Sequence, residues 1–240
     1  MEHRIFEIFV AAHIATGVTG AVAFWIPMIG KKGGNVHRKA GRIFTVAMLL
    51  TGSFACVLSL LTLSAPMITH PHLVDKFDDA FVRGIFGWLM LHLGLLTINL
   101  AWYGWLCALH RLNRAAMREW RNLALQGALF IAALNCAFQG WRIEQPLMIG
   151  MSCVGVATVI TNLWFLYKPQ ARIFDWQKEH LKALVGAGIS VYTAFMAFGS
   201  VRLLPQLALN PVMWATPIVI GVSTILWHWR VLDLRLRKNA

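Results

Sequence analysis

The chain has 240 residues, of which 58% are hydrophobic and 13% charged, and its formal net charge is +12. That much apolar surface exceeds what a soluble core of this size needs, so lipid is expected to be the solvent for most of the chain. A basic protein can also bind nucleic acid, but here the order of the charges along the chain favours a membrane topology and no nucleic-acid partner.

Predominantly apolar runs of about 17 to 25 residues are long enough to cross a bilayer as single helices. The sequence contains seven of them and no linker long enough to separate domains, which predicts an all-α, seven-helix transmembrane bundle formed by residues 1–240 as one domain. The predicted spans are Ile5 to Ile29, Ile43 to Ala65, Gly84 to Leu109, Leu123 to Trp141, Leu147 to Tyr167, Ala183 to Leu204 and Val212 to Trp229.

The basic residues fall on alternate loops. Seventeen of the 22 Lys and Arg residues lie in the loops after the first, third and fifth spans and in the tail after the seventh. Because cytoplasmic loops carry the excess of Lys and Arg, this bias predicts an outer N-terminus and a cytoplasmic C-terminus.

Two histidines lie well inside predicted spans, His13 in the first and His92 in the third. Both are about nine residues from the outer end of their helix, hence roughly 13 Å deep. Two imidazoles at one depth could ligate a haem iron, with Gly17 and Gly20 giving the macrocycle room. The alternatives are histidines that only pack between helices, and a substrate or proton site.

A second group of candidates lies at the predicted cytoplasmic face. The loop after the first span carries His37, Arg38 and Arg42, and Glu179 and His180 precede the sixth span. Guanidinium groups and backbone amides beside a glycine turn could hold a phosphate, a lipid head group or a cofactor. The simpler interpretation is topogenic charge plus a turn.

The predicted outer loop contains His70, His72 and Asp75. Two imidazoles in an H-x-H pattern with nearby carboxylates are ligands for Zn or another divalent ion, although an ordinary solvated loop has the same composition. In the sixth span, small residues recur at helical spacing and predict one closely packed face: Gly186, Ser190, Thr193, Ala197 and Ser200.

Two stretches carry a resemblance to a known family. The first combines H-x-x-x-G from His13 with K-G-G-x-x-H-R-x-x-G-R from Lys32, and the second runs from Lys178 through Y-T-A-F at Tyr192 to W-A-T-P at Trp214. Together they resemble a family of bacterial multi-pass membrane proteins whose activity is undefined. The resemblance implies functional roles for these residues: His13, His37, Arg38, Gly41, Arg42, Glu179 and His180.

The chain is also loosely similar to cytochrome b561-like and other membrane b-type cytochromes, which share His-bearing helices and basic inner loops. We therefore expect a bacterial inner-membrane protein with a buried histidine site, surrounded by lipid, whose leading function is electron transfer through haem b with a redox partner or a membrane subunit. The alternatives are a small-solute or lipid transporter or binding protein, and a non-catalytic assembly or sensor subunit.

Overall fold

The computed structural model describes residues 2–199 and 210–238, and side chains for residues 4–199 and 210–234. Every regular element in these ranges is helical. The elements are α1 (Glu2–Ile29), α2 (Asn35–Ser64), α3 (Pro66–Thr69), η1 (Pro71–Leu73), α4 (Asp79–Val82), η2 (Arg83–Leu89), α5 (Met90–His110), η3 (Ala116–Arg118), α6 (Trp120–Arg142), α7 (Pro146–Tyr167), α8 (Asp175–Ala194), η4 (Phe195–Gly199) and α9 (Pro211–Lys238).

Seven helical stretches in the described ranges are long and apolar enough to cross a membrane, as the sequence predicted. Several begin earlier than their apolar run. The second starts at Asn35 and the third at Asp79, because a helix continues through polar residues at the membrane surface that hydropathy does not count. The predicted end of the sixth span at Leu204 and the small residue Ser200 lie outside the described residues.

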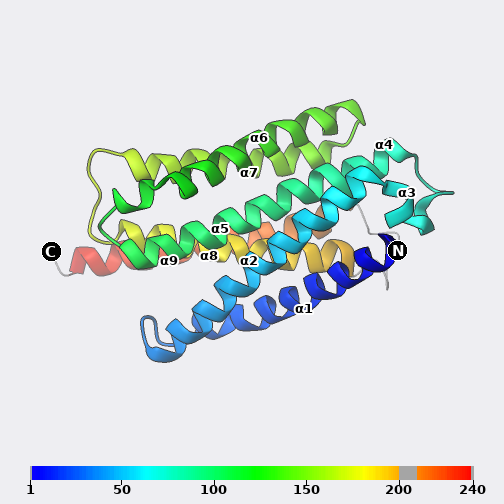
Figure 1. Cartoon of the computed structure of the whole chain (residues 1–240). Helices are drawn as coiled ribbons and strands as arrows, with labels where there is room; N and C mark the ends of the chain where they lie inside the picture. The colour runs from blue at the N-terminus through cyan, green and yellow to red at the C-terminus, as the bar shows by residue number, and fades with distance from the viewer. Residues whose placement is uncertain (1, 200–209, 239–240) are drawn as a thin grey trace.

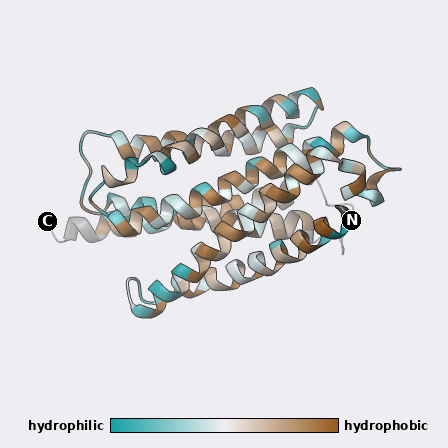
Figure 2. Cartoon of the chain, viewed as in Figure 1, coloured by the Kyte–Doolittle hydropathy of each residue, from teal (hydrophilic) through white to brown (hydrophobic). Residues whose placement is uncertain are grey.

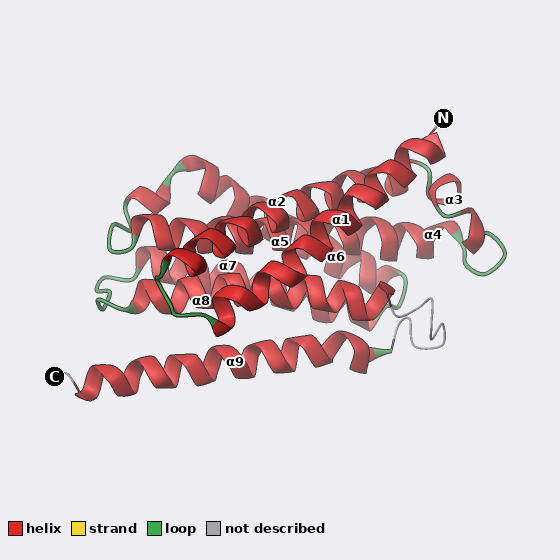
Figure 3. Ribbon diagram, turned by 90° about the horizontal axis from the view of Figure 1, so that it is seen from below, coloured by secondary structure: helices red, strands yellow, loops and turns green. Residues whose placement is uncertain are grey.

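Two pairs of neighbouring spans lie on either side of a central helix, α5 (Figure 1). α1 packs along α2, α6 packs along α7, and α5 lies between these pairs, in contact with α2 and α6 and also with α8. α9 packs mainly against α8 and runs along the edge of the bundle (Figure 3). Hydrophobic residues dominate the helices, whereas hydrophilic residues gather at the loops on the two ends (Figure 2). α1 begins and α9 ends at opposite ends, as an odd number of spans requires.

The closest approach of α2 and α5 depends on two glycines. A Cβ built on Gly52 would lie 2.8 Å from the carbonyl oxygen of Gly94, and one built on Gly94 would lie 3.0 Å from the carbonyl oxygen of Gly52. Any larger side chain would push the two backbones apart, which is the usual reason for small residues at membrane helix crossings.

Two spans contain a π-helical segment at the same end of the bundle. Arg83–Leu89 precedes α5, and Phe195–Gly199 follows α8. The two segments touch through Phe86 and Phe198, whose ring centroids lie 6.0 Å apart. π-Helical turns are rare and are found mostly at functional sites.

Candidate functional site

An elongated cavity of about 880 Å³ runs through the bundle between α1, α2, α5, α7, α8 and α9. Along α8 and η4 its wall extends from Lys182 to Gly199, which corresponds to roughly 25 Å along the helix axis. Most of the wall is aliphatic or aromatic. Ile14 and Val18 border the cavity and are each 55% exposed, so it communicates with the lipid-facing surface along α1.

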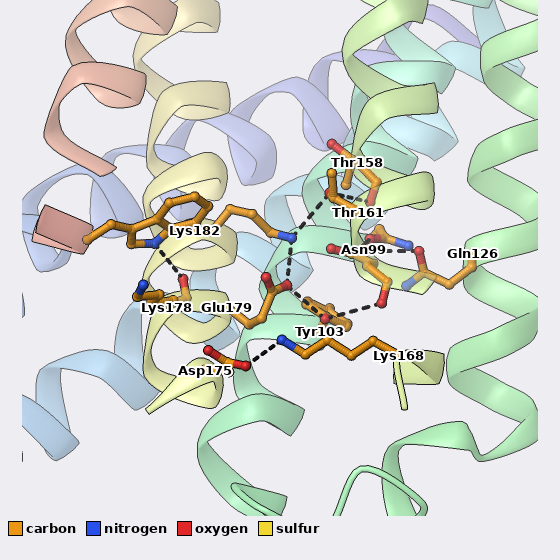
Figure 4. A network of polar contacts seen from close by, with 12 residues as sticks. Asn99, Tyr103, Gln126, Thr158, Thr161, Lys168, Asp175, Lys178, Glu179 and Lys182 are labelled. Atoms are coloured by element: carbon orange, nitrogen blue, oxygen red, sulfur yellow. Dashed lines mark hydrogen bonds and ion pairs between the residues drawn. The ribbon is translucent and has the colours of Figure 1, made fainter. Parts of the chain in front are cut away.

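One end of the cavity meets a charged pair. Lys182 donates from Nζ to Glu179 Oε2 at 2.6 Å and to Thr161 Oγ1 at 3.2 Å, and the buried Tyr103 hydroxyl donates to the same Glu179 oxygen at 2.9 Å (Figure 4). Lys182 is the sole charged side chain on the cavity wall among the described residues. The ion pair is therefore the polar end of an otherwise apolar space.

Behind this pair lies a cluster of buried amides from three helices. Asn162 Nδ2 donates to Asn99 Oδ1 at 3.1 Å and to Gln126 Oε1 at 3.4 Å, and Gln126 Nε2 donates to Asn122 Oδ1 at 3.4 Å. Asn162 also joins the cluster to Tyr103, whose hydroxyl is 3.5 Å from its backbone carbonyl. The cluster continues the polar region from the cavity wall into the interface of α5, α6 and α7, where it fixes the position of Tyr103.

His13 lines the cavity at mid-length. Its Nδ1 lies 3.0 Å from the Thr51 carbonyl oxygen on α2. Because a carbonyl oxygen only accepts, Nδ1 carries the proton and Nε2 of the neutral ring has the free lone pair. Gly17 also lines the cavity, whereas Gly20 packs against α2, where a Cβ would lie 2.8 Å from Met48 Sδ.

His92 belongs to a different interface. It is fully buried, its Nε2 donates to the Met151 carbonyl oxygen of α7 at 3.1 Å, and a Cβ built on Gly155 would lie 2.3 Å from its Cε1. Within the described chain its Nδ1 has no hydrogen-bond partner. The structure thus does not bring His13 and His92 together: one faces the α1–α2 side and the other is enclosed by α6 and α7.

The candidates at the predicted inner face separate into two groups. His37 lies close enough to His180 for the two rings to interact electrostatically. Nδ1 of His37 is hydrogen-bonded to the Pro27 carbonyl oxygen, and Nδ1 of His180 to that of Gly104. Three other predicted residues do not join this pair. Arg38 and Arg42 are exposed, Arg38 donating to Asn35 Oδ1 at 2.6 Å, and Glu179 turns toward Tyr103 and Lys182.

Of the metal ligands predicted in the loop of residues 70–75, only His70 and His72 lie near each other, with ring centroids 6.0 Å apart. His70 is buried, and its Nδ1 is hydrogen-bonded to Thr69 Oγ1 at 3.0 Å. Its ring lies against Phe86, with ring centroids 4.5 Å apart. Burial, aided by the nearby His72, lowers the pKa of His70 to about 4. His72 and Asp75 are exposed, and no three His, Cys, Asp or Glu residues in the described ranges gather as metal ligands. His70 instead lines the cavity, at the end that also contains Phe86.

Sequence reasoning missed the role of Lys182, which counts as a loop charge because it directly precedes the predicted sixth span. The signal that could have found it is its spacing from Glu179: three residues apart on a helix, opposite charges share a face. No family model matches the chain, and no curated protein and no solved structure shows a significant similarity to it.

Proposed function

We propose that this protein binds a long, mainly apolar molecule taken from the surrounding membrane, with the cavity as the binding site. The observation that carries the proposal is the shape and chemistry of the cavity: about 880 Å³, apolar walls from six helices, and one charged pair at one end. Ligand sites commonly combine apolar walls with a few placed polar groups in volumes of about 300 to 1,000 Å³. The opening beside Ile14 and Val18 gives a route from lipid.

The function is best tested with a C16 alcohol that carries a diazirine in its alkyl chain. After ultraviolet irradiation of the protein in nanodiscs, peptides of α1, α2 and α8 that line the cavity should be labelled, and excess hexadecan-1-ol should suppress the labelling. Gly17→Leu and Ser190→Leu fill the cavity from α1 and from α8, and each should strongly reduce the labelling.

Thr19→Leu is the matched control, because Thr19 is exposed on α1 and does not line the cavity. If labelling falls only on lipid-facing side chains, or is the same in the wild type and both cavity variants, the protein does not bind its ligand there.

Binding of haem b, and hence electron transfer, is a second proposal that rests on His13. Haem-ligating histidines commonly donate their other ring nitrogen to a carbonyl, and His13 has this arrangement toward Thr51 while it faces the cavity. His92 lies at another interface, so the opposite ligand would be another residue, and His70 is the other imidazole on the wall. Soret and α bands in a dithionite-reduced spectrum, lost in His13→Ala, would support it; their absence after growth with added haem would exclude it.

For the membrane itself, we propose a bacterial inner membrane with the N-terminus outside and the Lys182 end of the cavity toward the cytoplasm. This orientation is supported by the distribution of Lys and Arg between alternate loops.

A further inference from the structure

Lys182 is unusually buried for a lysine near the end of a membrane-spanning helix. A lysine near a helix end ordinarily extends its ammonium group to the aqueous surface. The side chain of Lys182 is only 15% exposed, and its ammonium lies between Glu179 and Thr161 at the cavity wall (Figure 4). Ionisable groups held inside a membrane protein mark functional positions by default.

The charge of Lys182 is already balanced. Glu179 is 13% exposed and lies 2.6 Å from Nζ of Lys182. Glu179 cannot easily turn away, because the same oxygen accepts from the Tyr103 hydroxyl at 2.9 Å and Tyr103 is fully buried. The polar end of the cavity is therefore locally neutral although it contains a full positive charge.

The hydrogen-bonding capacity of Lys182 is not exhausted. An ammonium group has three N–H donors. Two of them are accounted for by Glu179 and Thr161. No other described residue accepts a hydrogen bond from Lys182, which leaves one donor for a molecule in the cavity.

Charge and donor count together define the ligand's polar end. A carboxylate or phosphate placed beside Lys182 would bring a second negative charge close to the fixed Glu179, in surroundings where charges are weakly screened. An uncharged acceptor, such as an alcohol, ketone or ester oxygen, takes the remaining N–H without altering the charge balance.

Resting on the proposed function, we infer that the ligand is a long-chain lipid that ends in an uncharged hydrogen-bond acceptor, bound by Lys182, and that Glu179 excludes anionic lipids. Glu179 thus sets specificity without being the group that binds the ligand.

The test compares two competitors with the same chain, hexadecan-1-ol and hexadecanoate, by the concentration of each that halves photolabelling of the cavity in nanodiscs. In the wild type the alcohol should compete at least about tenfold better. Glu179→Gln leaves the Lys182 charge unbalanced, so hexadecanoate should become the better competitor by about tenfold or more, the usual scale of one charge-assisted hydrogen bond. Lys182→Met should weaken competition by the alcohol, while hexadecanoate should stay the poorer competitor because Glu179 keeps its negative charge.

Lys178→Met is the matched control: it breaks another ion pair of α8, with Asp233, but Lys178 does not line the cavity, so it should keep the wild-type order. Equal competition by both molecules in the wild type and in Glu179→Gln, with cavity labelling intact, would overturn the assigned specificity alone. Absence of cavity labelling in the wild type would overturn the proposed function instead.

Discussion

Replacing Gly155 with alanine tests whether the His92 ring lies against α7. The new Cβ would lie 2.3 Å from Cε1 of His92, which is fully buried and cannot move without losing its bond to the Met151 carbonyl. Overpacking costs about 1–3 kcal/mol and the lost hydrogen bond about 1 kcal/mol more. Since alanine favours a helix over glycine, a control on the same helix is needed to remove that gain.

Gly150→Ala is that control, because Gly150 lies on α7 and a Cβ added there would meet no atom within 4 Å. The helix preference cancels between the two variants, so Gly155→Ala should be less stable than Gly150→Ala by about 2–4 kcal/mol. Reversible unfolding by SDS in mixed micelles, followed by circular dichroism, measures the difference. Adding His92→Ala to Gly155→Ala should recover part of the loss. Equal stability of the two alanine variants would mean that His92 does not contact Gly155.

Three further predictions concern other parts of the molecule. The pKa of His70 is about 4 in the folded protein and about 6.5 in the unfolded chain. The contribution of the neutral His70 to the free energy of unfolding should therefore be fully present above pH 6.5 and should fall by at most about 3 kcal/mol as the pH drops to 4. In His70→Asn the unfolding midpoint should lack this part of the decline. Arg118 donates from Nε and Nη2 to the Leu166 carbonyl oxygen at the end of α7, at 3.1 and 2.6 Å. Arg118→Ala should therefore lower the free energy of unfolding by about 1–3 kcal/mol. A loss no larger than that of Arg121→Ala would contradict this role. A reporter fused after Ala240 should be cytoplasmic and one inserted between His72 and Asp75 external; a periplasmic C-terminal reporter would refute the orientation.

The number of spans could be predicted from the sequence because an apolar run of membrane length is a property of consecutive residues. Helix ends could not, since Asn35 and Asp79 belong to helices but not to apolar runs. Counting residues along each span predicts a shared depth for His13 and His92. Which neighbour each ring faces depends on how the helices pack, and a single sequence does not contain that information.

The same distinction applies to the candidate site. Glu179 could be chosen in advance, and Lys182 is its neighbour three residues along α8. Tyr103, however, lies on α5, whose contact with α8 is set by packing: a Cβ on Gly104 of α5 would meet Leu184 of α8 at 2.7 Å. The small face of α8 was only partly a packing surface. Gly186 lies against Leu100 of α5, but Gly186, Ser190 and Thr193 also line the cavity.

The two π-helical segments affect how one end of the bundle can change shape. Phe86 in one segment and Phe195 and Phe198 in the other all line the cavity. A π-helical turn holds one more residue than the α-helical turn it replaces, so passing that extra residue along the helix rotates the side chains it crosses by about 100° while the rest of the helix keeps its register. A shift of this kind would turn Phe86, Phe195 and Phe198 at this end of the cavity without moving the rest of either span.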